Sequence, residues 1–171
     1  RWPAQYKNNK KISSIVQPHD LTATILAAAG YSESELEDSM PDSVNLTPLI
    51  KGEKEKAHDY AVCCYRNTGI CDQGEYYDPE IQATMIRNER YKLNVYHNIN
   101  KETAGEGELF DMKADPDEFN NLWDNSEYEN IKNKMLTNLL NWSIKQEISN
   151  LGSRGGKLLP DASQKMDNKL N

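Results

Sequence analysis

The sequence predicts an α+β fold, in which a small antiparallel sheet of about four strands packs against a long C-terminal helix. Three short runs near the middle of the chain, at residues 85–86, 91–96 and 109–112, mix β-branched, aromatic and aliphatic residues in near-alternation. A fourth run at residues 59–65 alternates through Tyr60, Val62 and Cys64. The apolar spacing then changes to three or four residues after position 124, which is typical of a helix.

The breaks between these runs indicate how the strands connect. Residues 88–90 are few enough for a hairpin loop, whereas residues 98–107 contain two glycines and allow a longer loop. The step Asp115-Pro116-Asp117 ends the third run, because proline cannot donate to a strand ladder and fixes its own φ. Residues 66–82 form another long loop of the kind that often carries binding residues.

The C-terminal helix is predicted to begin at the caps Asp124, Asn125 and Ser126, with Glu127 near the positive end of the helix dipole. An apolar stripe follows at Tyr128, Ile131, Met135, Leu139 and Trp142, widened by Leu136, Leu140 and Ile144. We expect this stripe to pack on the sheet, with a partner-binding helix as the alternative. No internal repeat is present, and residues 151–171 are predicted to form an irregular tail.

The N-terminal part reads differently from the sheet region. Residues 1–3 suggest the remnant of a strand, and the spacing of apolar residues predicts a short helix with Asp20 as N-cap and Gly30 just past its end. Capping explains Asp20 better than a catalytic pair with His19, because adjacent side chains do not generally face each other. Residues 31–56 are acidic and rich in turn residues, and are interpreted as a solvated connector.

Composition excludes several broad functions. The chain has 171 residues, enough for a domain with a core, but only 37% are hydrophobic. A net charge of −7 argues against a general nucleic-acid binder, which needs clustered basic residues. No apolar run approaches the roughly 20 residues that span a bilayer.

The three cysteines, Cys63, Cys64 and Cys71, are too few for a disulfide framework. Buried or free thiols are the favoured interpretation, with a bridge to Cys71 as an alternative and a metal site as a weaker one.

Two ordered blocks of residues resemble the C-terminal part of type I, formylglycine-dependent sulfatases. The first block is Met85-Ile86-Arg87, Glu89-Arg90-Tyr91-Lys92-Leu93, Tyr96-His97, Gly107-Glu108-Leu109-Phe110-Asp111, Asp115-Pro116 and Glu118-Phe119-Asn120-Asn121-Leu122-Trp123. The second is Arg1-Trp2-Pro3, His19-Asp20-Leu21, Thr24-Ile25-Leu26, Ala29-Gly30 and Leu49-Ile50-Lys51-Gly52. Together they cover most of residues 1–150.

This resemblance implies an alkaline-phosphatase-like architecture, of which residues 1–52 would be the last strand and helix of a larger α/β domain. Residues 53–150 would be the C-terminal subdomain, and residues 151–171 the tail. The chain would then be a fragment, whose first 50 or so residues dock on a missing sheet and which could self-associate when isolated. The family further implies a periplasmic or secreted bacterial enzyme of polysaccharide breakdown.

The chemistry implied by the family is hydrolysis of a sulfate ester of a carbohydrate or an aryl alcohol. Such an enzyme uses a formylglycine made from a C/S-x-P-x-R motif and a bound cation, usually calcium. That motif is absent here, because its nearest match, beginning at Ser39, has Ser43 in place of the arginine. The spacing of Asp111, Asp115 and Asp117 lacks the glycine and glutamate of a calcium loop. We therefore expect the fragment alone to be inactive, with formylglycine and calcium in the missing domain.

The role left to this region is structural, together with residues at the rim of the substrate pocket. The candidates are Tyr65 and Arg66 at the entrance of a long loop, Arg87 at a strand end, and His97 at the start of the second long loop. Arginine offers paired donors to sulfate or carboxylate, and tyrosine can stack on a sugar. For Arg87, Arg90 and Lys92, charge pairing with Glu89 or Glu108 on the sheet surface is the alternative.

Two other functions remain open from the sequence. One is the C-terminal part of a related phosphoesterase or phosphonate hydrolase, since the segment that would separate these enzymes is absent. The other is a non-catalytic module that binds a ligand or partner. The isolated strand and helix before the sheet, and the sequence Glu118-Phe119-Asn120-Asn121-Leu122, favour the sulfatase.

Overall fold

A computed structural model describes residues 11–66, 82–97 and 106–152 of the chain. The chain divides into two compact units, with residues 60–148 forming the sheet unit and residues up to 59 belonging to the other, which we call the N-terminal unit. No helix in the described ranges combines the length and the apolar character needed to cross a membrane.

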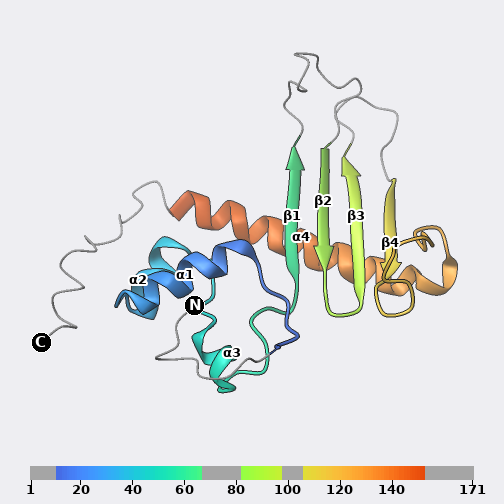
Figure 1. The fold of residues 1–171 in the computed structure, drawn as a ribbon. Helices are drawn as coiled ribbons and strands as arrows, with labels where there is room; N and C mark the ends of the chain where they lie inside the picture. Colours follow the sequence, from blue (N-terminus) through green and yellow to red (C-terminus); the bar gives the residue numbers. More distant parts are fainter. Residues whose placement is uncertain (1–10, 67–81, 98–105, 153–171) are drawn as a thin grey trace, which may run out of the picture. The chain divides into compact units, whose positions relative to one another are not determined.

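The sheet unit is a four-stranded antiparallel meander in the order β1-β2-β3-β4 (Figure 1). Its strands are β1 (Ala61–Arg66), β2 (Gln82–Arg87), β3 (Tyr91–His97) and β4 (Gly107–Asp111). The predicted strands and their antiparallel pairing are therefore confirmed, with β1 beginning and ending slightly later than expected. The short loop between β2 and β3 is a hairpin, in which Asn88 Oδ1 accepts from the backbone N–H groups of Arg90 and Tyr91.

Helix α4 (Glu129–Gly152) crosses one face of the sheet and closes the core (Figure 1). Ile86, Leu93 and Leu109 from three neighbouring strands meet Met135 and Leu139 from α4. These side chains share one face because partners across an antiparallel ladder point to the same side. The expected packing of the helix stripe on the sheet is confirmed for Tyr128, Ile131, Met135, Leu136, Leu139 and Trp142.

Two details of the helix differ from the prediction. The cap at Asn125 serves a short 3₁₀ turn, η1 (Ser126–Tyr128), and α4 begins only at Glu129. Leu140 and Ile144, which were expected to widen the packed stripe, are 61% and 46% exposed. The spacing rule places them beside the stripe, but neither is among the side chains that pack on the core.

The outer edge of β4 is covered by the segment that leads to the helix. Leu122 N–H donates to the carbonyl of Leu109, and Asn121 Oδ1 accepts from Leu109 N–H at 3.0 Å. Trp123 lies so close to Gly107 that a Cβ there would stand 2.4 Å from the indole. Glycine at position 107 is therefore required by a close approach, and the tryptophan closes one end of the core.

The N-terminal unit contains three helices, α1 (Pro18–Ala28), α2 (Glu33–Ser39) and α3 (Thr47–Lys51). Helix α1 ends before Gly30, whose φ of 106° confirms the predicted left-handed position. Helices α2 and α3 correct the prediction of a solvated connector at residues 31–56. Their charged residues face solvent, but Leu36 and Leu49 are buried, and each short helix is held by one such anchor.

Asp20 is the centre of the N-terminal unit rather than the N-cap of α1. The N-cap is Gln17, and the Asp20 carboxylate reaches back to accept from Gln17 N–H at 2.7 Å. It also accepts from Val44 N–H at 2.9 Å and lies 2.9 Å from His58 Nε2. A completely buried carboxylate requires such partners, and these join three stretches of the chain that are distant in sequence.

Candidate functional site

Two of the four predicted rim residues meet at one end of the sheet. Arg66 ends β1 and His97 ends β3, and both lie opposite Gln82 at the start of β2. The three side chains therefore share the face of the sheet that also carries Thr84, two residues further along β2. We call Arg66, Thr84 and His97 the rim cluster.

The Thr84 hydroxyl joins the two predicted residues. Arg66 Nη2 donates to Thr84 Oγ1 at 2.9 Å, and His97 Nε2 lies 2.8 Å from the same oxygen. Thr84 is only 4% exposed, whereas Arg66 and His97 are exposed. A buried hydroxyl thus fixes two exposed side chains that can meet a ligand.

Arg66 is anchored by the backbone as well. Its Nη1 donates to the carbonyl of Tyr65 at 3.0 Å and to that of Ala83 at 2.5 Å. A guanidinium has five N–H donors, so the three bonds to Tyr65, Ala83 and Thr84 leave two that are not engaged by the described residues. Held in this way, Arg66 presents paired donors with little freedom left to lose when an anion binds.

His97 is biased towards its neutral form. Partial burial and then the positive charge of Arg66 hold the pKa of the imidazole below its ordinary value of 6.5. At neutral pH the ring is therefore a neutral hydrogen-bonding group beside a permanent cation. The cluster carries one positive charge at that pH and adds a second only under acidic conditions.

The other two predicted residues lie elsewhere. Tyr65 is next to Arg66 in sequence and therefore points to the opposite face of the sheet, where its ring is 54% exposed. Arg87 ends β2 at the hairpin, so it lies at the other end of the strand from the rim cluster. The sequence singled out both for being at strand ends, but it could not fix the face or the end. A contact of Tyr65 or Arg87 with substrate stays a prediction, and the place of Arg87 at the far end of β2 from the rim cluster favours Arg66 over it.

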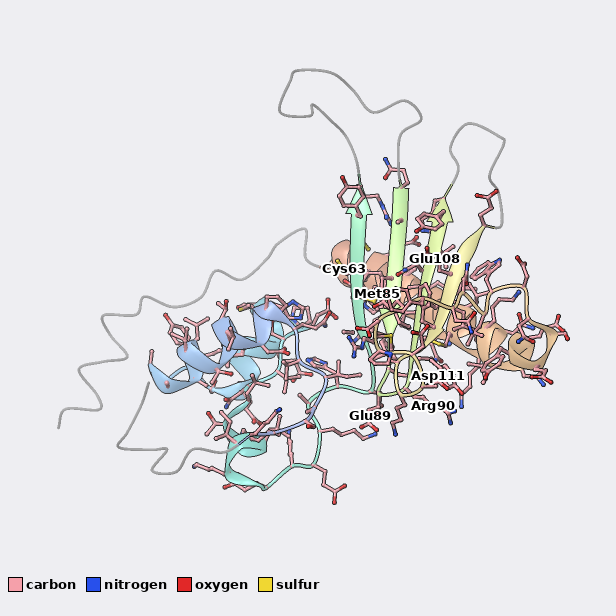
Figure 2. The ribbon with its side chains drawn as sticks, turned by 45° about the vertical axis from the view of Figure 1, so that its right-hand side comes forward. Cys63, Met85, Glu89, Arg90, Glu108 and Asp111 are labelled. Carbon is pink, nitrogen blue, oxygen red and sulfur yellow. The ribbon has the colours of Figure 1, made fainter. Side chains whose placement is uncertain are left out.

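Charge pairs at the hairpin end involve different partners from those expected. Arg90 donates through Nε and Nη2 to Asp111 Oδ2 at 3.0 and 2.8 Å, and the two residues lie together at that end of the sheet (Figure 2). Lys92 pairs with Glu118 instead of Glu89 or Glu108. Glu108 accepts from Asn94 Nδ2 and from the hydroxyl of Tyr96. Burial, and then the hydrogen bond to Glu108, raise the pKa of that phenol.

The aspartates after β4 have structural partners. Arg90 and the N–H groups of Lys113 and Ala114 hold the pKa of Asp111 below its ordinary value. Asp115 accepts from the N–H groups of Phe119 and Asn120. Asp111 and Asp115 thus organise the strand end and the turn, as the sequence suggested.

In the described residues there is no grouping of His, Cys, Asp or Glu side chains that could hold a metal ion. Cys63 and Cys64 are free, exposed thiols on β1, while Cys71 lies outside the described residues. The expected strand remnant at residues 1–3, most of the two long loops and residues 153–171 also lie outside them.

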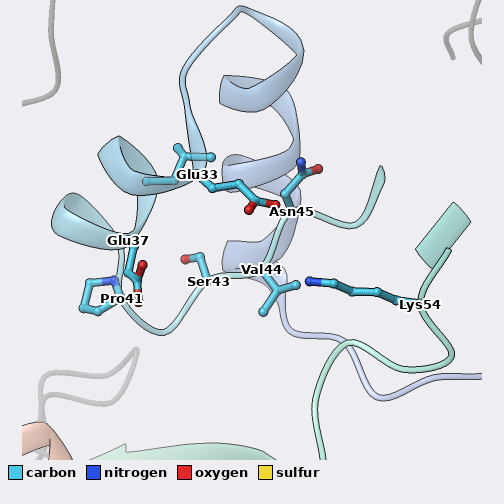
Figure 3. A pocket seen from close by; sticks show the side chains of 8 residues that line it. Glu33, Glu37, Pro41, Ser43, Val44, Asn45 and Lys54 are labelled. Carbon is cyan, nitrogen blue, oxygen red and sulfur yellow. The ribbon is translucent and has the colours of Figure 1, made fainter. Parts of the chain in front are cut away.

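The N-terminal unit contains a small cavity of about 270 Å³ beside α2 (Figure 3). Its lining includes Glu33, Glu37, Ser43, Asn45 and Lys54. The lining carries both negative side chains, from the two glutamates, and a positive one, from the lysine. Because both glutamates are exposed, the cavity is open to solvent. We assign it no ligand.

Comparison with known proteins identifies the class to which this sheet and helix belong. A solved structure described as a complex with its substrate, D-glucosamine-2-N,6-O-disulfate, superposes with a TM-score of 0.53 at 26% identity, over 74% of this chain and 23% of that one. An ulvan-active sulfatase of Formosa agariphila is 23% identical over 200 residues. An N-acetylglucosamine-6-O-sulfatase of Bacteroides thetaiotaomicron is 28% identical over 156 residues. The architecture is that of the C-terminal region of sulfatases.

The family itself follows from a match over most of the chain. Residues 1–145 match the model of the family described as N-sulphoglucosamine sulphohydrolase, C-terminal, and the chain belongs to that family. It spans 38% of the length of the Formosa protein and 25% of that of the Bacteroides protein. The predicted sulfatase resemblance is thereby confirmed.

Proposed function

We propose that the complete protein to which this chain belongs is a sulfatase that hydrolyses sulfate esters of carbohydrates. The family match over residues 1–145 supports the reaction class, and the curated relatives act on ulvan and on 6-sulfated N-acetylglucosamine, as their names state. We propose that the substrate of this protein is likewise a sulfated carbohydrate, without naming a particular sugar. By the same reasoning we propose an alkaline-phosphatase-like main domain and a periplasmic or secreted location.

The catalytic groups would come from outside these 171 residues. The chain has no C/S-x-P-x-R motif for formylglycine, and its described part offers no metal site. The residues present thus do not fit calcium or the formylglycine nucleophile, and we derive no chemical step from this chain. Its domain boundaries, at about residues 52 and 150, stay a proposal.

The contribution of this chain is to bind the substrate at the rim of the pocket. The single observation that carries this role is the convergence of Arg66 and His97 on the Thr84 hydroxyl. A fixed arginine with two N–H donors that no described residue engages, next to an exposed imidazole, is suited to a sulfate or carboxylate group on a sugar. The sheet and α4 hold that pair in place.

Sulfate release tests the proposal. The full-length protein, expressed with a formylglycine-generating enzyme, should release sulfate from N-acetylglucosamine 6-sulfate, ulvan oligosaccharides or an aryl sulfate, while residues 1–171 alone should release none. Activity only on phosphate or phosphonate esters would instead assign the protein to the related hydrolases. Activity of the fragment would show that the chemistry does not lie in a missing domain.

A further inference from the structure

The rim cluster contains one group that the sequence did not single out. Thr84 lies in the middle of β2, is 4% exposed, and has no ionisable group, yet its hydroxyl accepts from Arg66 and lies 2.8 Å from His97 Nε2. A hydroxyl has one proton to donate and can accept two hydrogen bonds. Whether the hydroxyl donates that proton to His97 determines which ring nitrogen of His97 carries the proton of the imidazole.

The donors and acceptors around Thr84 favour one arrangement. Arg66 can only donate, so its bond of 2.9 Å makes Thr84 Oγ1 an acceptor. If His97 is neutral, as its lowered pKa favours at pH 7, the hydroxyl proton can be donated to His97 Nε2 across 2.8 Å. Nε2 is then the acceptor of the ring, and the proton of the neutral imidazole must be on Nδ1.

We propose that Thr84 is a positioning residue that holds His97 in the Nδ1–H tautomer, so that His97 and Arg66 together form a recognition site for an anionic group of the glycan. The site offers the Nδ1–H of His97 and the two N–H groups of Arg66 that the described residues leave unengaged. All three are donors, and an oxyanion such as sulfate or carboxylate accepts several hydrogen bonds at once. A neutral sugar hydroxyl can accept at most two hydrogen bonds and carries no negative charge to pair with Arg66.

The surroundings of the cluster agree with an anionic ligand. Four other positions lie beside the cluster on the same face of the sheet. Cys64 and Val95 are the cross-strand partners of Thr84, and Gly107 is the partner of Val95. Gln82 is the cross-strand partner of both Arg66 and His97. None of these is a carboxylate, and Glu108 is on the other face because it is opposite Asn94. The charge of Arg66 is therefore not neutralised by a carboxylate on these described strands.

The first test observes the tautomer directly. In full-length protein labelled with ¹⁵N at histidine, and with the resonance assigned through His97→Gln, we expect His97 at pH 7 to show a protonated Nδ1 and an unprotonated Nε2. Thr84→Val keeps the shape but removes the hydroxyl, and should shift the ring towards the Nε2–H form. Thr84→Ser restores the hydroxyl and should restore the Nδ1–H form. A wild-type ring protonated on Nε2 would overturn the assignment.

The second test identifies the ligand and rests on the proposed function only for the choice of sugars. Glucosamine 6-sulfate, glucuronate and glucose are titrated into the labelled protein. We expect one or both anionic sugars to shift the Nδ1 resonance and glucose not to, with the sulfate and carboxylate arms showing which anion is recognised. Thr84→Val should weaken that binding by about tenfold, equivalent to one hydrogen bond.

Equal shifts with all three sugars, or none with either anion, would contradict anion recognition. The tautomer does not depend on catalysis, so these results remain separate from any failure to release sulfate. The matched control is Thr137→Val on α4, whose hydroxyl bonds only to the carbonyl of Asn133 in the described structure and which should change neither measurement.

Discussion

The charged residues at the two ends of the sheet differ in their partners. Arg90 and Asp111 lie at the hairpin end, where the carboxylate is buried and also caps the following turn. Among the described residues, Arg66 at the opposite end donates only to uncharged groups, the carbonyls of Tyr65 and Ala83 and the hydroxyl of Thr84. An arginine with free donors and no carboxylate partner is better suited to an external anion than one already paired.

The Asp111 pairing predicts a particular pH dependence of stability. Because hydrogen bonds from Arg90 hold its folded-state pKa below 3.8, the unfolded chain binds the proton more readily, and stability is lost as pH falls through the folded-state pKa. Asp111→Asn should therefore cost about 2 kcal/mol at pH 7, with the difference from wild type shrinking below about pH 4. Urea unfolding of the two proteins between pH 7 and pH 3 measures this. A difference that stays constant over that range would contradict it.

What could be read from the sequence at this scale was the type of residue and its position at a strand end. Arg66 and His97 were predicted because long loops follow them, and the structure joins them. Thr84 was missed because a threonine inside a strand is ordinary for β structure, and only the register shows that it lies next to both. Similarly, Asp20 was taken for an N-cap because its bonds to Val44 and His58 are long-range.

At the scale of elements, helix α4 stabilises the sheet through one stripe only. Leu139 is 8% exposed and packs on Ile86, Leu93 and Leu109, whereas the adjacent Leu140 is 61% exposed. Hydrophobic spacing predicted the helix and most of its packed side chains. It could not predict which flanking side chains of the stripe the sheet covers, because that depends on how the helix packs across the strands.

The two leucines form a matched pair. Leu139→Ala should lower the free energy of unfolding by about 3 kcal/mol, because it removes buried methyl groups and leaves a cavity. Leu140→Ala removes the same atoms from an exposed position and should change it by less than about 0.5 kcal/mol. Chemical denaturation of both variants gives the values, and similar losses in the two would show that α4 packs differently.

The connector at residues 31–56 shows where composition alone was insufficient. Its acidic residues and prolines favoured exposed turns, yet Tyr31, Leu36, Leu46 and Leu49 are buried. Short helices with one or two apolar anchors lack the repeated spacing by which longer helices are recognised. The capping box at Ser32 and Glu35 was the local signal for α2 that could have been used.

At the scale of the whole molecule, the described part of the chain has an exposed apolar surface on α1. On α1, Leu21 and Ile25 are 60% and 67% exposed and lie one turn apart, so they form an apolar strip. The relatives are much longer than this chain, and we propose that such surface is covered in the complete protein.

Isolated residues 1–171 should therefore self-associate through that strip. Sedimentation velocity over a range of concentrations should show a rise in average mass, and the double variant Leu21→Ser, Ile25→Ser should reduce it. Leu140→Ser, which changes an exposed leucine on α4 instead, serves as the control. A fragment that stays monomeric at high concentration would contradict the expectation.

The measurement that tests the central claim most directly is the steady-state kinetics of sulfate release by full-length protein carrying Arg66→Ala or Arg87→Ala. The two variants remove the same side chain from opposite ends of the sheet. We predict that Arg66→Ala raises KM for a sulfated oligosaccharide about tenfold or more, with a smaller effect on kcat, while Arg87→Ala leaves both near wild type. Unchanged kinetics in Arg66→Ala, or an equal loss in Arg87→Ala, would contradict the assignment of the rim cluster to the substrate.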